Sequence, residues 1–300
     1  MITVQGKVAP IESQIINKLE NNIKTVELQL LYGISNEDVL HLVSKFRELD
    51  IYQVHPYINN DCAEVNIRNL MNSKFITMFE DACFIANEVA KRRYHKVGVI
   101  LHNNISKEEL ENYRCIREYV VSTLTYLYQL YPNIYICLEN VTPILPNLNS
   151  ESGLFPEDLR YVCETLNSYG IPTFITVDTC HALMTEKHFN TILADIDITR
   201  CDTYNPKKYS LYDWFEVCGD YIKTIHLASL KEFGNYPWNH GIYDKSTFKD
   251  MVSNYIKQYS EQFCPNVTWT VEVKEYNYSK CINQANAIKD CLDILKEDSE

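Results

Sequence analysis

The feature that most constrains this 300-residue chain is a regular alternation of short apolar runs with segments of helical periodicity. Most of the runs are nearly continuous in Val, Ile and Leu, which is typical of parallel strands buried on both faces. The eight runs are Ile2–Val8, Thr25–Leu30, Ile51–His55, Lys96–His102, Ile134–Glu139, Thr173–Asp178, Ile222–Leu227 and Val267–Val273. Such β/α alternation predicts a parallel sheet covered by helices.

The segments between the runs carry helix signals. Ser106 and Glu109 form a capping box that predicts a long helix reaching Tyr131, and Pro156 opens a helix that stops at Gly170. The other helices are expected after Pro10, after Ser35, over Ser73–Lys91, and near 209–219, 246–262 and 280–296. Eight strands and eight helices predict a single (β/α)8 TIM barrel domain over residues 1–300, with a doubly wound open sheet as the alternative.

Composition narrows the possible partners. The sequence has no glycine-rich phosphate-binding motif, which argues against a nucleotide cofactor. The net charge of −12 weighs modestly against nucleic acid, although bound divalent ions can make a cleft positive within an acidic protein. The 11 cysteines show no paired spacing, and neither a signal peptide nor a membrane-spanning stretch is evident. These features predict a cytoplasmic protein without a membrane partner.

Potential metal ligands gather where the apolar runs end. Of the 8 histidines, five lie at or just beyond such an end: His55, His102, His181, His226 and His240. The carboxylates of Glu139, Asp178 and Glu272 each end a separate run. A barrel brings these ends to one rim, and imidazoles mixed with carboxylates suit zinc, with manganese or iron as alternatives.

Each of these residues also has a structural interpretation. In the run Asp178-Thr-Cys-His181-Ala, Asp178 can be a helix cap and His181 a core residue. Glu139 and Glu272 can be paired with a lysine or arginine instead of a metal. Because Lys231 and Lys274 are the main basic residues near these strand ends, we favour metal ligation.

Taken together, these strand ends resemble the endonuclease IV family (AP endonuclease family 2) within the xylose isomerase-like TIM barrel superfamily. The ordered motifs that carry the resemblance are His55-Pro-Tyr57, Val99-Ile-Leu-His102, Leu138-Glu139-Asn140, Asp178-Thr-Cys-His-Ala182, His226-Leu227 followed by Lys231, and Val271-Glu272. The resemblance implies a metal-dependent phosphodiester hydrolase in which metal-bound hydroxide attacks phosphorus beside an abasic site in DNA.

The resemblance also implies a division of ligands among two, possibly three, zinc ions. Glu139 would bridge two metals, His55 and His102 would hold the first, and His181 and His240 would belong to the third. The second would be held by Asp178, His226 and Glu272. The implied catalytic residues are Glu139, Asp178 and Glu272, and the implied substrate contacts are Tyr57, Lys231 and Trp238.

The sequence departs from the family pattern in three places. Trp238-Asn239-His240 lacks the family's aspartate, which puts the third metal in doubt. Ala228-Ser229 replaces Asn-Asp after His226, and the loop from Leu31 to Glu37 has no arginine for penetrating duplex DNA.

These departures keep a second hypothesis open, a sugar or sugar-phosphate isomerase or epimerase on the same barrel. Glu139, Asp178, His226 and Glu272 would then hold one Mn²⁺ or another divalent ion, and the two glutamates would transfer protons. The acidic net charge favours this alternative. Three further histidines that a single-metal isomerase does not need, namely His55, His102 and His181, favour the hydrolase. A barrel that only binds is a third, weaker hypothesis.

Overall fold

The computed structural model describes residues 2–57, 65–142, 153–191, 210–231, 239–264 and 266–296. The barrel strands are β1 (Thr3–Val8), β2 (Thr25–Gln29), β3 (Asp50–His55), β4 (Val97–Asn103), β5 (Ile134–Asn140), β6 (Thr173–Asp178), β7 (Ile222–Leu227) and β10 (Thr268–Val271). A short antiparallel pair, β8 (Leu230–Lys231) and β9 (Asn239–His240), follows β7.

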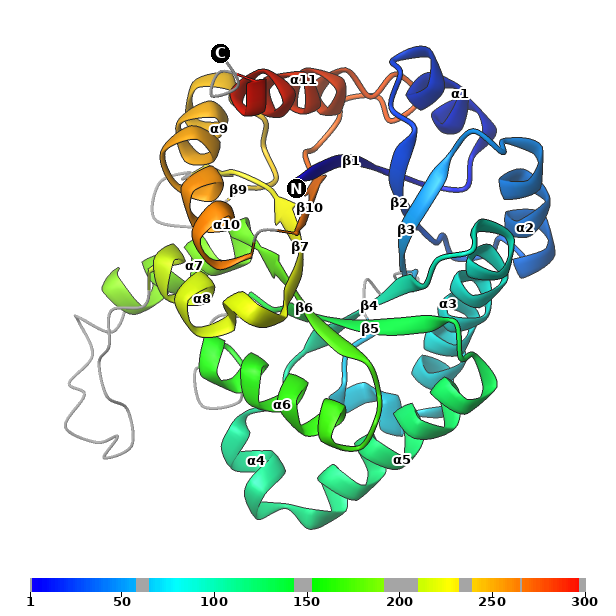
Figure 1. The fold of residues 1–300 in the computed structure, drawn as a ribbon, viewed down its shortest axis with the longest axis vertical. Helices are drawn as coiled ribbons and strands as arrows, with labels where there is room; N and C mark the ends of the chain where they lie inside the picture. The colour runs from blue at the N-terminus through cyan, green and yellow to red at the C-terminus, as the bar shows by residue number, and fades with distance from the viewer. Residues whose placement is uncertain are drawn as a thin grey trace.

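Helices follow the strands along the chain and surround them in space (Figure 1). They are α1 (Glu12–Glu20), α2 (Asn36–Lys45), α3 (Ser73–Arg93), α4 (Lys107–Asn112), α5 (Arg114–Leu130), α6 (Pro156–Ser168), α7 (Thr179–Thr191), α8 (Leu211–Cys218), α9 (Lys245–Met251), α10 (Lys257–Phe263) and α11 (Ile282–Lys296). Short 3-10 turns lie at Arg68–Met71 and Gly219–Tyr221, and a π-helical turn, Val252–Ile256, joins α9 to α10.

The strands form a closed parallel barrel in the order β1-β10-β7-β6-β5-β4-β3-β2, with β1 paired to both β10 and β2. This confirms the predicted (β/α)8 barrel and excludes the open sheet. Because all barrel strands run in the same direction, their carboxyl ends lie at one rim of the barrel. The predicted site residues on the strands are therefore brought to the same end.

The apolar runs form strands because both of their faces are buried. All seven residues of β4 and of β5 are buried, with alternate side chains toward the helices and toward the barrel interior. The helix-facing side includes Val97, Val99 and Leu101, which belong to the main hydrophobic cluster. This packing holds β4 and β5 rigidly, and with them His102 and Glu139 near their ends.

Two helical segments differ from the prediction. The long helix expected from Ser106 to Tyr131 is divided at Tyr113, whose backbone (φ −109°, ψ 86°) is not helical, into α4 and α5. Helix α7, which begins directly after Asp178, was not predicted, because its sequence lacks a clear apolar stripe.

The interior of the barrel has a polar layer below the rim. Gln5 donates to Gln53 Oε1 at 2.5 Å and to Thr270 Oγ1 at 2.6 Å, and Gln53 donates to Thr224 Oγ1 at 2.7 Å. All four residues are buried. Their hydrogen bonds cross the barrel between strands distant in sequence, and they form the floor beneath the candidate site.

No helix in the described part of the chain is long and apolar enough to cross a membrane. The cysteines within the described ranges are free thiols, in line with their unpaired spacing in the sequence.

Candidate metal centre

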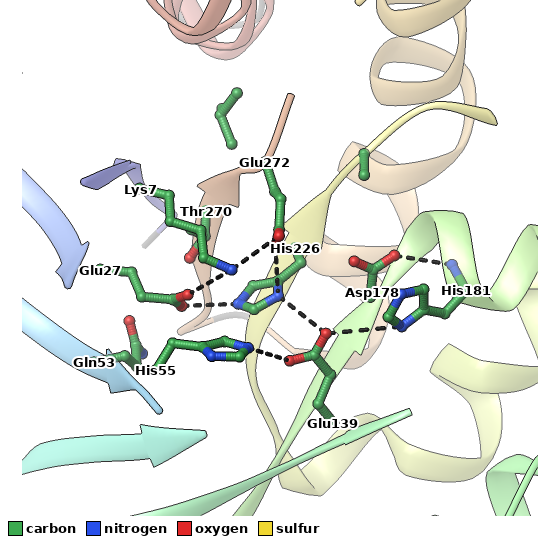
Figure 2. A network of polar contacts seen from close by, with 12 residues as sticks. Lys7, Glu27, Gln53, His55, Glu139, Asp178, His181, His226, Thr270 and Glu272 are labelled. Carbon is green, nitrogen blue, oxygen red and sulfur yellow. Dashed lines mark hydrogen bonds and ion pairs between the residues drawn. The ribbon is translucent and has the colours of Figure 1, made fainter. Parts of the chain in front are cut away.

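Above the polar floor, the strands β1 to β7 and the residue that follows β10 each contribute one ionisable side chain to a single cluster. Figure 2 labels all of these side chains except that of His102. In strand order from β1 to the end of β10, these residues are Lys7, Glu27, His55, His102, Glu139, Asp178, His226 and Glu272. Every member except Glu272, whose side chain is 26% exposed, is nearly or fully buried. So many ionisable groups at this depth require strong mutual compensation or bound ions.

Three groups of residues in this cluster have the geometry to hold metal ions, with potential ligand atoms within 4.8 Å of one another. The groups are His55–His102–Glu139, Glu139–Asp178–His181 and Asp178–His226–Glu272. Glu139 belongs to the first two groups and Asp178 to the last two. The structure therefore brings together all the predicted ligands except His240, whose side chain lies outside the described residues.

Asp178 ends β6 and caps α7. Its Oδ1 accepts a hydrogen bond from the backbone N–H of His181 at 2.9 Å, as an N-cap residue does. Asn140 fixes the same junction, because its Oδ1 accepts from the Asp178 N–H at 2.6 Å and its Nδ2 donates to the Asp178 carbonyl at 3.0 Å. The capping interpretation of Asp178 is thus correct, and it is compatible with the place of Asp178 in the metal-binding groups.

Three histidines of the site have one ring nitrogen held by an oxygen. Nδ1 of His55 lies 2.9 Å from the Pro56 carbonyl, and Nδ1 of His181 lies 2.7 Å from the Asn140 carbonyl. Nε2 of His226 lies 2.8 Å from Glu27 Oε2. Metal-binding histidines characteristically donate one ring N–H to an oxygen in this way, which directs the other nitrogen toward the metal.

The other nitrogens of His55 and His226 face Glu139. His55 Nε2 lies 3.9 Å from Glu139 Oε2, and His226 Nδ1 lies 3.3 Å from Glu139 Oε1. His226 Nδ1 lies 3.1 Å from Glu272 Oε2, and neither of these atoms, nor Glu139 Oε2, has a further hydrogen-bond partner within the described residues. Unsatisfied acceptors that converge in a buried site fit a cation, and a nitrogen and oxygen donor set fits zinc or manganese.

The charges in the cluster favour the ligand forms of Glu139 and His55. Burial opposes ionisation of Glu139, but His226 and His102 outweigh it and hold the pKa of Glu139 well below its usual value. Burial and the Lys7 ammonium lower the pKa of His55 to about 4. At neutral pH Glu139 is therefore a carboxylate and His55 a neutral imidazole. Burial opposes protonation of His226, whereas Glu27 and Glu139 outweigh burial and raise the pKa of His226, so that a metal must displace a proton from that ring.

Two members of the cluster, Lys7 and Glu27, were missed in the sequence. Lys7 Nζ lies 2.8 Å from Glu272 Oε1 and 3.3 Å from Glu27 Oε1. The expectation that Lys231 and Lys274 are the main basic residues near these strand ends therefore overlooked Lys7, which pairs with Glu272. Both residues lie inside their strands, on the alternate positions that face the interior, and this alternation is the signal that would have found them.

Of the three predicted substrate contacts, the structure describes the side chain of Tyr57 alone. Tyr57 directs its hydroxyl to Asp81 Oδ2 at 3.4 Å and packs edge-on against Tyr32. Trp238 and the side chain of Lys231 lie outside the described residues.

A cavity of about 470 Å³ opens beside the cluster, between the ends of β1, β2 and β10. Lys7 and Glu272 form part of its wall, and Leu30, Tyr32 and Tyr278 add apolar and aromatic surface. A ligand in this cavity contacts the cluster from the side of Glu272.

The fold and the placement of the cluster define the protein as a (β/α)8 TIM barrel with a cluster of potential metal ligands at the carboxyl ends of its strands. No protein-family model and no curated protein matches the sequence. Among solved structures, endonuclease IV from Thermus thermophilus is similar over 98% of this chain and 99% of its own, with a TM-score of 0.58 and 12% identity.

An AP endonuclease of family 2 from Brucella melitensis is similar over 94% of this chain and 97% of its own, with a TM-score of 0.56 and 12% identity. D-allulose 3-epimerase from Methylomonas sp. is similar over 98% and 97%, with a TM-score of 0.53 and 13% identity. These structural neighbours are enzymes, and they include both endonucleases and a sugar epimerase. At this level of identity the similarity establishes the shared fold.

Proposed function

We propose that this protein is a metal-dependent phosphodiester hydrolase of the endonuclease IV type, acting on DNA that contains an abasic site. The observation that carries the proposal is the overlap of the three ligand groups at Glu139 and Asp178. Overlapping groups provide for adjacent metal ions. The His55–His102–Glu139 group in particular has no role in an isomerase that needs one metal.

In this proposal His55, His102 and Glu139 hold one ion, and Asp178, His226 and Glu272 hold a second. Glu139 would be shared between the two, while His181 and His240 would belong to a third position. The bound ions supply electrostatic stabilisation of the attacking and leaving oxygens. The substrate contacts proposed from the sequence are Tyr57, Lys231 and Trp238.

The charge of the cluster supports occupancy by two ions. Glu27, Glu139, Asp178 and Glu272 carry four negative charges and Lys7 carries one positive charge. Once metal binding has displaced the extra proton of His226, one divalent ion leaves the cluster with a net charge of minus one, whereas two leave it at plus one. Only the second state attracts an anionic phosphodiester, and it also offsets the acidic net charge of the chain.

The test combines metal content with cleavage. We expect at least two zinc ions per chain by elemental analysis, and incision of a duplex oligonucleotide at a single abasic site. Glu139→Gln should lose bound zinc and reduce cleavage at least 10³-fold, because it removes the shared ligand. Glu118→Gln, on an exposed Arg114 pair, is the matched control. A zinc-replete protein that leaves the abasic duplex intact contradicts the proposal.

The second candidate function is a divalent-metal-dependent epimerase or isomerase for a small sugar, favoured by the cavity beside Glu272. The pKa values argue against it. Although burial opposes ionisation, Lys7 and His226 hold the pKa of Glu272 well below its usual value, and the pKa of Glu139 is low as well. A carboxylate that transfers protons works best with a pKa near the working pH.

The epimerase candidate is tested with the manganese-loaded protein and a panel of ketohexoses and their phosphates, followed by chromatography of the sugars. Epimerisation that is lost in Glu272→Gln, together with one bound metal per chain, would favour this function over hydrolysis.

A further inference from the structure

Lys7 and Glu27 form an ion pair inside the barrel, and each of them also contacts a residue of the candidate metal centre (Figure 2). They lie directly opposite each other on the paired strands β1 and β2. Their side chains are 13% and 0% exposed. Neither belongs to a group of potential metal ligands, yet each bonds to a residue that does.

Glu27 determines which nitrogen of His226 faces the centre. Its Oε2 lies 2.8 Å from His226 Nε2, so this nitrogen carries the proton that is donated to the carboxylate. His226 Nδ1 then points between two ligand carboxylates, 3.3 Å from Glu139 Oε1 and 3.1 Å from Glu272 Oε2. This orientation leaves Nδ1 as the ligand atom.

Lys7 determines how many oxygens of Glu272 face the centre. Its ammonium donates to Oε1 of Glu272 at 2.8 Å, while Oε2 faces His226 Nδ1 at 3.1 Å. Held in this way, Glu272 offers one oxygen to a metal and not two. With one atom each from Asp178 and His226, and with Glu139 as the shared ligand of the proposed function, the site would offer four ligand atoms.

We propose that Lys7 and Glu27 are positioning residues that restrict the Asp178–His226–Glu272 site to four ligands and thereby make it selective for zinc over manganese. Zinc accepts four nitrogen and oxygen ligands in a tetrahedral arrangement, whereas manganese favours six, mostly oxygen. The inference rests on the proposed metal centre, but it does not depend on which reaction the centre catalyses.

The decisive variant is Lys7→Met, which has a similar length and no donor. Freed from Lys7, Glu272 can present both oxygens, so the ratio of zinc affinity to manganese affinity should fall at least tenfold. The ratio of the two affinities is compared, and not either affinity alone, because removing a positive charge strengthens the binding of every cation. Lys7→Arg retains a donor and should retain the ratio. Lys274→Met is the matched control, since Lys274 is exposed and bonds to neither glutamate.

Glu27→Gln tests the other half of the proposal and has the shape of the native residue. Its amide N–H can donate to Nε2, which moves the imidazole proton to Nδ1 and blocks the ligand atom. Zinc and manganese affinities should therefore fall together, by about 10–100-fold, the usual effect of losing such a partner. This variant decides the question if Lys7→Met does not fold.

Both affinities are measured by competition with a chromophoric chelator on the full-length metal-free protein, without substrate, with circular dichroism as a check of folding. A lower zinc-to-manganese ratio in Lys7→Met, with Lys274→Met unchanged, supports the proposal. An unchanged ratio in Lys7→Met, or unchanged affinities in Glu27→Gln, overturns it and leaves the hydrolase proposal standing. Failure of the zinc-loaded native protein to cleave DNA affects only the proposed function.

Discussion

At the scale of single residues, the candidate site depends on side chains that bond in two directions. Asp178 caps α7 through Oδ1 and still belongs to two groups of potential ligands. His226 bonds to Glu27 through Nε2 and faces Glu139 through Nδ1. Because one side of each residue is fixed by the protein, the other is oriented before any ion binds, which lowers the cost of binding.

This orientation leads to a prediction for His55. The substitution His55→Gln removes a nitrogen from the His55–His102–Glu139 group and leaves the Asp178–His226–Glu272 group intact. We expect one zinc ion fewer per chain by elemental analysis and cleavage at least 100-fold slower. His41→Gln, at a histidine on α2 away from the barrel interior, is the control. Unchanged zinc content would show that His55 is not a ligand.

A second prediction concerns the bottom of the barrel, where Gly98 faces the ring of Tyr135. A Cβ at Gly98 would lie 2.8 Å from Tyr135 Cε2 and 3.0 Å from both Cys137 Sγ and Gln53 Cγ. Gly98→Ala should therefore lower the free energy of unfolding by about 1–3 kcal/mol, as overpacked cores do. Urea denaturation of the metal-free protein measures this loss; equal stability would mean that the ring moves aside freely.

The sequence predicted the potential ligand residues better than the residues that bond to them. His55, His102, Glu139, Asp178 and His226 are recognisable because each ends an apolar run, and parallel strands bring such ends together. The partners of these residues are set by barrel closure and register, which no local pattern encodes. Lys7 meets Glu272, and Glu27 meets His226, across 265 and 199 positions of the chain.

At the scale of helices and strands, prediction succeeded where periodicity was strong. All eight barrel strands were predicted within a few residues, because near-continuous apolar runs have few alternatives in a β/α pattern. The division between α4 and α5 was missed because the apolar pattern continues across Tyr113, where only the backbone changes. Helix α7 was missed because its sequence lacks a clear apolar stripe, since the polar residues of the candidate site begin at its first turn.

Helix α6 gives a prediction about pH. Burial raises the pKa of Asp158 to about 6, although its carboxylate accepts a hydrogen bond from the Lys107 N–H at 2.8 Å. Between about pH 4 and 6 the folded state thus holds a proton that the unfolded state has released. The stability contributed by protonated Asp158 is therefore lost as the pH rises through 6.

Asp158→Asn keeps an oxygen for the Lys107 N–H and removes the buried charge. We expect the variant to be more stable than the native protein by about 1–3 kcal/mol at pH 7.5, and the gain to shrink toward zero at pH 4.5. Urea titrations of the metal-free proteins at the two pH values measure the difference. A gain independent of pH would argue against this ionisation.

At the scale of the whole molecule, the cluster concentrates negative charge at the centre of an already acidic protein. Four of its side chains are carboxylates, three of them nearly or fully buried. Lys7 offsets only part of this charge. The metal-free barrel should therefore be destabilised by its own active-site cluster, and any cation that binds there should stabilise the folded state.

We expect zinc to raise the unfolding temperature of the metal-free protein by several degrees. Free zinc at 100 times its dissociation constant contributes about 2.7 kcal/mol per site. Differential scanning fluorimetry with zinc, followed by addition of excess chelator, should show a reversible shift that is absent in Glu139→Gln. The same transition with and without zinc would mean that the cluster binds no ion.

The pairing of β1 with β10 has a consequence for biosynthesis. The first and last barrel strands lie side by side, and Lys7 from one bonds to Glu272 at the end of the other. A ribosome must therefore have translated the chain as far as residue 272 before the Asp178–His226–Glu272 group is complete. A nascent chain that ends before residue 272 has only Asp178 and His226 of that group, so we expect any ion that this group holds to bind late, after this part of the chain has been synthesised.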